Sequence, residues 1–213
     1  MICTDSTCLD QLSKVDASIC SVKKGKIFKV AIQFKDDTNN QFVEASNAIS
    51  EKASWDTFLA ASDTTTITMS PLLENAVLGA QEALENGENP EGDANVVDMS
   101  STPFTAEIKV PSKSTYEAFH KMMCSSSRRL TVYIIYERGV EARYIGDSSS
   151  PSGYAGIALS NNTFMAGDET REGTKADLEY MPIAFKIPSG WSDDSAFVPF
   201  DGFDAYDLFY EAP

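Results

Sequence analysis

The stretch from Phe104 to Tyr144, FTAEIKVPSKSTYEAFHKMMCSSSRRLTVYIIYERGVEARY, decides the fold. Between residues 104 and 110, apolar side chains alternate with polar ones, which predicts a half-buried strand. Pro111 ends this strand. Ser114 then lies three residues before Glu117, the spacing of a capping box at the start of a helix. The stretch therefore opens with a strand followed by a helix.

The second half of the stretch predicts the sheet on which this helix packs. Apolar side chains at helical spacing give the helix one stripe, made of Tyr116, Phe119 and Met123. From residue 130 to 136 both faces of the next strand are apolar, so we expect it to be central or covered on both sides. Arg138 and Gly139 predict a turn into a strand at 140–144. One helix on an antiparallel sheet is the expected nucleus of the fold.

Composition limits the function. The net charge is −15, which argues against a reader of nucleic acid, because such a protein must neutralise phosphates. No run of 18 apolar residues is present, and the first residues lack a basic region followed by an apolar run. We expect a protein that has no membrane partner and is made in the cytoplasm.

Charge is segregated along the chain. Residues 14–35 contain six lysines and one acid, whereas residues 74–98 contain seven acids and no base. Residues 191–213 contain six acids and no base. These runs are either solvated loops or complementary surfaces that meet between copies of the protein.

The chain divides into three parts. Residues 1–25 form an arm, residues 26–190 a β domain, and residues 191–213 an aromatic, acidic tail. Within the β domain we expect a helix at about 112–124 and a long loop at about 71–100, where residues 71–86 fit either a helix or an extended arm. Further predictions are strands at 26–34, 64–70, 157–164 and 175–188, with a bulge or edge at Pro182, a helix at 46–61 and an exposed turn at 87–98.

The tail carries too many aromatic side chains to be solvated, because they would form a large exposed apolar patch. We expect them to dock on this subunit or on a neighbouring copy.

Signals for catalysis are weak. His120 lies in the predicted helix, and Cys124 follows one turn later, but a helix C-terminus raises the pKa of a thiol. The cysteines at 3, 8, 20 and 124 lack the spacing of a zinc site, and we treat them as reduced thiols. No phosphate-binding or nucleophile motif occurs. We expect no enzyme, no cofactor and no metal.

The order of the parts resembles the tail-tube and related virion proteins of bacteriophages. The resemblance covers about residues 26–190 and rests on four segments in order. They are KIFKVAIQF, KASWDTFLAASDTTTITMSPLLEN before a long polar loop, the strand–helix–strand unit from FTAEIKVPSKSTYEAFHKMMC to RRLTVYIIYERG, and REGTKADLEYMPIAFKIP. The N-terminal cysteines and the aromatic tail depart from the pattern.

The resemblance implies an antiparallel β-sandwich or partly closed barrel with one flanking helix, mainly β within the α+β class. It also implies a virion protein that assembles into rings or a tube, contacts other virion proteins and lets DNA pass without specific binding. The predicted interface residues are Lys23, Lys24, Lys26, Lys29, Glu88, Glu91, Asp93, Phe197, Phe200, Phe203 and Tyr206.

Three alternatives stay open. Within the same class, the chain is a head–tail connector, a capsid-associated protein or a tail-accessory protein. From another class, it is a monomeric domain that binds carbohydrate or protein through Tyr154, Trp191 and Tyr206. A small enzyme that uses His120 with Cys124 is the third.

Overall fold

The structure is a computed structural model that describes residues 25–35, 41–43, 46–88, 94–124, 130–146, 153–168 and 179–208. For residues 84–88, 94–97 and 124 it describes the backbone alone. The predicted arm at 1–24, with Lys23 and Lys24, lies outside the described residues, as do Glu91 and Asp93.

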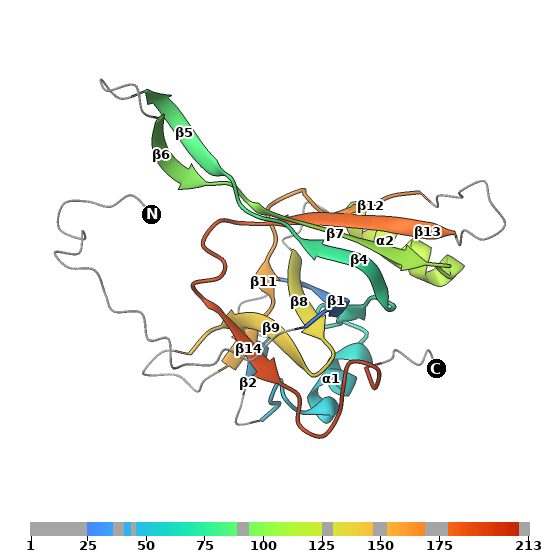
Figure 1. Cartoon of the computed structure of the whole chain (residues 1–213). Coiled ribbons are helices and arrows are strands. Elements are labelled where there is room, and N and C mark those ends of the chain that lie inside the picture. Colours follow the sequence, from blue (N-terminus) through green and yellow to red (C-terminus); the bar gives the residue numbers. More distant parts are fainter. Residues whose placement is uncertain are drawn as a thin grey trace.

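The larger sheet, sheet A, is antiparallel and has eight strands (Figure 1). Its main path runs in the order β2, β10, β9, β8, β1 and β3, while β11 pairs with β8 and β14 with β9. The strands are β1 (Ile27–Phe34), β2 (Gln41–Val43), β3 (Thr68–Met69), β8 (Leu130–Tyr136), β9 (Gly139–Tyr144), β10 (Gly153–Ala155), β11 (Ile157–Ala158) and β14 (Ser195–Pro199).

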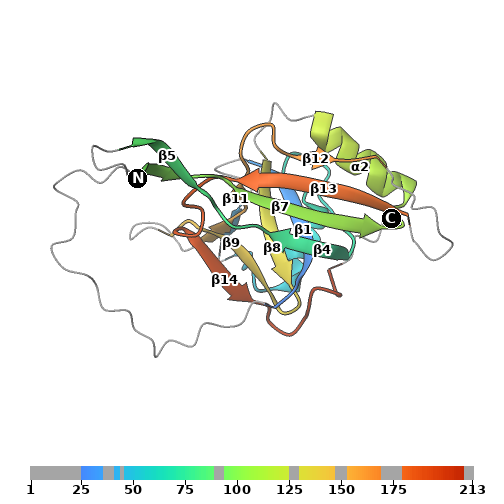
Figure 2. The same cartoon turned by 45° about the horizontal axis from the view of Figure 1, so that its top comes forward.

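The smaller sheet, sheet B, is antiparallel and has four strands in the order β12, β13, β7 and β4. They are β4 (Leu73–Leu78), β7 (Thr102–Lys109), β12 (Met165–Ala166) and β13 (Tyr180–Ile187). Helix α1 (Lys52–Leu59) lies beside sheet A, and α2 (Lys113–Cys124) lies beside β12 (Figures 1 and 2). A third, two-stranded sheet joins β5 (Ala83–Glu88) to β6 (Ala94–Met99).

Strand β8 is buried on both faces along its whole length, as the sequence predicted. It lies between β1 and β9 in sheet A. Val132 and Ile134 belong to a core between the two sheets, whereas Tyr133 and Ile135 belong to a second core on the opposite face. The alternation of side chains along a strand therefore divides the protein into two cores on either side of one sheet.

The core between the sheets is built on aromatic stacking. Phe104 of β7 and Phe185 of β13 are almost unexposed, and their ring centroids lie 4.3 Å apart. Phe119 of α2 packs on Phe164 with a centroid distance of 6.1 Å. Helix α2 thus closes this core next to β12.

The second core is covered by α1 and by the end of the chain. Trp55 of α1 is fully buried, and its indole nitrogen donates a hydrogen bond of 2.7 Å to the carbonyl oxygen of Ile49. Its ring lies 4.8 Å from Phe42 and 5.5 Å from Tyr133, measured between centroids. Ala205 and Leu208 fill the remaining space and are completely buried.

The fold class is confirmed: two antiparallel sheets pack into a sandwich with α2 beside them. The strand predictions at 26–34, 104–110 and 130–136 are confirmed, with small shifts at their ends. The register of β1 slips between Ile27 and Lys29, so Phe28 packs on the second core, not with Val30 on the first.

Other local predictions need correction. The helical alternative for residues 71–86 is wrong, because β4 and β5 are extended there. The first turn of α2 is capped by Ser112, not Ser114, because the Ser112 hydroxyl accepts a hydrogen bond of 3.1 Å from the N–H of Thr115. No bulge occurs at Pro182, since β13 keeps a continuous register with β7 and Met181 supplies the buried position before it.

The remaining differences concern the length of elements. The helix predicted at 46–61 is confined to Lys52–Leu59, and the strands predicted at 64–70 and 157–164 shrink to two residues each, β3 and β11. The exposed turn predicted at 87–98 is in part a strand, because β6 begins at Ala94.

A buried carboxylate fastens β14 to sheet A. Glu141 of β9 is 2% exposed and accepts hydrogen bonds from the hydroxyl of Tyr136, at 2.8 Å, and from that of Ser195, at 3.2 Å. Burial and the neighbouring Glu141 carboxylate raise the pKa of Tyr136. The carboxylate thus links three strands, β8, β9 and β14.

We expect Glu141→Leu to lower the free energy of unfolding by about 1–3 kcal/mol, because the buried hydroxyl of Tyr136 loses its acceptor and that of Ser195 keeps only the Ser192 carbonyl. Denaturant titration followed by circular dichroism measures this. Adding Tyr136→Phe removes the stranded hydroxyl and should recover part of the loss. If the double variant is less stable than Glu141→Leu alone, the hydroxyl is not the source of the effect.

Candidate functional site

The feature that stands out from the body is a two-stranded ribbon, β5 and β6. Figure 1 shows it projecting beyond the end of sheet B. It continues the pair β4 and β7 along the chain, and three hydrogen bonds hold the junction. They run from Gly79 N–H to the Pro103 carbonyl at 2.7 Å, from Ser100 N–H to the Glu82 carbonyl at 2.7 Å, and from Glu82 N–H to the Ser100 hydroxyl at 2.8 Å. We call β5 and β6 the ribbon.

The ribbon differs from most of the other described sheet edges, of which only β14, with five residues, is of similar length and unbulged. Edge strands β2, β3 and β12 have only three, two and two residues. The edge strand β4 is interrupted by a register shift between Glu74 and Val77, with Asn75 in the left-handed region at φ 51°. Short and bulged edges resist pairing with another chain. Each ribbon strand has six residues, and in the described part of the chain it pairs only with the other.

One residue of the predicted acidic interface lies in the ribbon. Glu88 is the last residue of β5, and Glu91 and Asp93 belong to the connection between the strands, outside the described residues. The sequence from 82 to 98 contains six acids and no base. An acidic ribbon is therefore the structural counterpart of the acidic loop that the sequence predicted.

Of the four lysines in the predicted interface, the structure describes Lys26 and Lys29, and these two differ in their exposure to solvent. Lys26 is exposed just before β1, whereas Lys29 is 1% exposed. A buried ammonium cannot contact a neighbouring copy, so we remove Lys29 from the predicted interface. The reason is that the second core covers the face of β1 to which Lys29 and Ala31 belong.

The aromatic tail docks on its own subunit over residues 195–208. Phe197 belongs to β14 and lies 5.8 Å from Tyr136 between ring centroids. Phe200 and Phe203 stack at 4.3 Å, and Tyr206 meets the ring of Phe28 at 5.3 Å. Tyr206 stays 44% exposed. A role of these four aromatic residues between copies stays a prediction.

We call residues 200–208 the strap, because they cross the second core. Backbone N–H groups of Phe200, Asp201 and Ala205 donate to the carbonyls of Arg138, Ser50 and Glu137, at 3.0, 2.8 and 2.9 Å. The strap is therefore tied to the β8–β9 turn and to the segment before α1.

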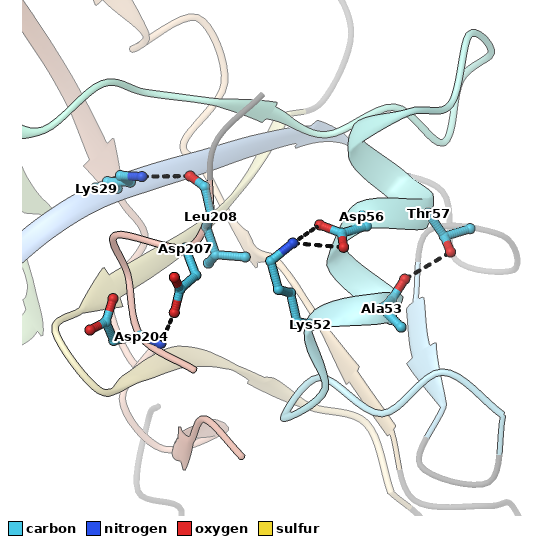
Figure 3. A network of polar contacts seen from close by, with 8 residues as sticks. All are labelled: Lys29, Lys52, Ala53, Asp56, Thr57, Asp204, Asp207 and Leu208. Atoms are coloured by element: carbon cyan, nitrogen blue, oxygen red, sulfur yellow. Dashed lines mark hydrogen bonds and ion pairs between the residues drawn. The ribbon is translucent and has the colours of Figure 1, made fainter. Parts of the chain in front are cut away.

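Lys29 holds the end of the strap (Figure 3). Its ammonium donates a hydrogen bond of 2.5 Å to the carbonyl oxygen of Leu208. Burial lowers the pKa of Lys29 to about 8, against the attraction of Asp204 and Asp207, which acts to raise it. The sequence showed neither the burial nor the tether, because the two partners lie 179 positions apart.

The residues named in the alternative predictions are placed as follows. The ring of His120 stacks on that of Tyr116, with 4.1 Å between the ring centroids. The Tyr116 hydroxyl donates a hydrogen bond of 2.7 Å to the Asp168 carboxylate. The indole N–H of Trp191 donates a hydrogen bond of 2.9 Å to the Thr102 hydroxyl. The ring of Tyr154 packs on that of Tyr144, with 5.5 Å between the ring centroids. The structure gives no position for the side chain of Cys124.

In the described ranges, no group of three or more histidine, cysteine or acidic side chains is arranged to hold a metal ion. No helix in the same part of the chain has the length and apolar character needed to cross a membrane.

Comparison with known proteins adds little. No family model and no curated protein sequence matches the chain. Among solved structures, the chain is similar to the crystal structure of an Hcp protein, at 11% sequence identity and a TM-score of 0.32. That match covers 81% of this chain and 99% of the other.

The tether predicts a specific pH dependence. Between pH 8 and about 10.5 the unfolded chain binds a proton at Lys29 that the folded chain does not, so this residue makes the free energy of unfolding rise with pH. Lys29→Met lacks this contribution. The stability difference between wild type and Lys29→Met should therefore shift in favour of wild type across that window.

Denaturant titrations of both proteins at pH 7, 8, 9 and 10 measure the difference, in which the titration of other groups cancels. A difference that stays constant from pH 7 to 10 contradicts the lowered pKa of Lys29.

Proposed function

We propose that this chain is a non-enzymatic structural protein that assembles with copies of itself through the ribbon. The observation that carries the proposal is the ribbon's projection from a body whose described edge strands are mostly short or bulged. A two-stranded ribbon is marginally stable alone, and its exposed edges can pair with another chain. Contact with another copy would stabilise the ribbon and cover those edges.

The finer proposal is a ring- or tube-forming subunit of a phage virion, of the tail-tube type. Its support is the order of segments that resembles that family. The charge of −15 fits a passage through which DNA moves without binding. On this proposal the protein is made in the host cytoplasm, ends in the virion and contacts other virion proteins, and it needs no catalytic group.

The distribution of charge indicates which surface of the next copy the ribbon would contact. The acidic ribbon and the lysine-rich segment before β1 are opposite in sign. Opposite charges on two surfaces favour encounter and select one orientation between copies. The ribbon of one copy would then lie near the start of β1 in the next, and exposed Lys26 belongs to this surface.

Light scattering and negative-stain imaging of the purified protein test the proposal directly. We expect rings, tubes or a defined multimer, and we expect the assembly to weaken as the salt concentration rises, because salt screens exposed charges. A monomer at every concentration and at low salt contradicts assembly through the ribbon.

Neutralising the ribbon tests where the contact lies. The combined changes Glu85→Gln, Glu88→Gln, Glu91→Gln and Asp93→Asn should weaken assembly by about tenfold or more, because the attraction to the basic segment is lost. Concentration-dependent light scattering measures the midpoint of assembly, and circular dichroism checks the fold.

A matched variant controls for net charge. It removes four exposed acids from the body, through Glu51→Gln, Glu117→Gln, Glu137→Gln and Asp193→Asn. We expect its assembly midpoint to stay near that of wild type. If both quadruple variants weaken assembly equally, or neither does, the charge of the ribbon does not direct the contact.

A further inference from the structure

The outer face of sheet B has a central row of uncharged residues. The registers align one residue from each strand across the sheet: Val77 of β4, Thr105 of β7, Ala184 of β13 and Met165 of β12. Val77 is 55% exposed and Met165 is 61% exposed, and Thr105 is also exposed. Figure 2 shows that no described element lies over β13, β7 and β4 on this side.

Charged side chains flank this row unequally. On the side toward the ribbon, Lys186 of β13 is paired in register with Pro103. On the opposite side, Glu107 of β7 lies between Glu74 and Pro182 in the register. Lys109 approaches Glu107 to 3.3 Å and Glu74 to 4.0 Å, so this group of three carries one net negative charge. One side of the row is positive and the other is negative.

Such a pattern is complementary to itself. If a second copy is turned by half a turn about an axis along the row, the two uncharged rows face each other. The same rotation carries Lys186 of each copy to the side where Glu107 of the other lies. A two-fold contact uses the same patch on both partners, which this face satisfies.

We propose that the outer face of sheet B is a second interface, where two copies of the chain pack face to face about a two-fold axis. The uncharged row is excluded from water, and the two charge pairs fix the orientation of the copies. Large exposed apolar side chains on a sheet face favour this, because an antiparallel sheet with one solvated face carries polar residues there. This contact adds to the proposed ribbon contact, and its test is made where the ribbon contact is weakened.

Ala184→Arg places a charge in the middle of the row, and Thr105→Arg does so on the neighbouring strand. Each change is introduced into the chain that carries the four neutralised ribbon residues. We expect the parent to be a dimer by sedimentation, and both arginine variants to be monomers with an unchanged circular dichroism spectrum.

The charge pair gives a test that does not depend on steric damage. Lys186→Glu alone should raise the dissociation constant of the dimer by about tenfold, because two interfacial pairs become repulsive. Combining Lys186→Glu with Glu107→Lys should restore most of the affinity. Rescue by the double exchange supports the two-fold contact, since two unrelated surface changes have no reason to compensate.

The outcomes separate the two interfaces. If the parent is a monomer at 100 µM, on the order of the concentration that a weak contact needs, the face-to-face contact is wrong and the ribbon proposal stands. If the parent assembles like wild type and the arginine variants do too, neither the charge of the ribbon nor the outer face of sheet B forms the contact, and both proposals are wrong. A dimer that the arginine changes leave intact also overturns the face-to-face contact.

Discussion

Burial of β8 on both faces is the constraint on which this structure depends. A strand with apolar side chains on both sides needs a layer against each face, and the chain supplies them from distant parts of the sequence. Sheet B covers one face. On the other face, α1 and the strap together cover β8. The last described residues of the chain therefore complete a core whose first strand is β1. Removal of either layer would expose a full row of β8 to water.

The sequence predicted what alternation along one segment can show. The alternation at 104–110 and 130–136 predicted two strands. Because both faces of the strand at 130–136 are apolar, the sequence also predicted that it is central or covered on both sides. Residues 71–86 remained ambiguous because Leu73, Val77 and Leu84 fit a helical stripe, and only pairing with β7 and within the ribbon selects the extended form. Lys29 was missed for the same kind of reason, since its neighbours come from the far end of the chain. Composition predicted an acidic, exposed segment at the place of the ribbon, but as a loop and a turn, not as paired strands.

The Lys29 tether shows how this protein combines a charged group with a core. An ammonium removed from water is destabilising unless it is compensated, and here a main-chain carbonyl of the strap accepts a hydrogen bond from it while the charges of Asp204 and Asp207 attract it. The same contact that lowers the cost of burying Lys29 fixes the position of Leu208 in the second core. Replacing Lys29 by an apolar side chain leaves the buried Leu208 carbonyl without this donor, so a loss of stability would not isolate the role of the charge. The contribution of Lys29 is therefore best sought in where the strap lies and in how stability varies with pH.

The two proposed contacts differ in what they can build. A ribbon that docks on a different surface of the next copy is heterologous, so repetition gives a closed ring or an open filament, depending on the rotation between copies. A face that meets its own equivalent is saturated after two copies. Extended growth therefore has to come from the ribbon, while the sheet B face can only join such products in pairs. If the proposed ribbon contact forms, the geometry of the ribbon junction, held by Gly79, Glu82, Ser100 and Pro103, would help to set the rotation between copies and hence whether the assembly closes.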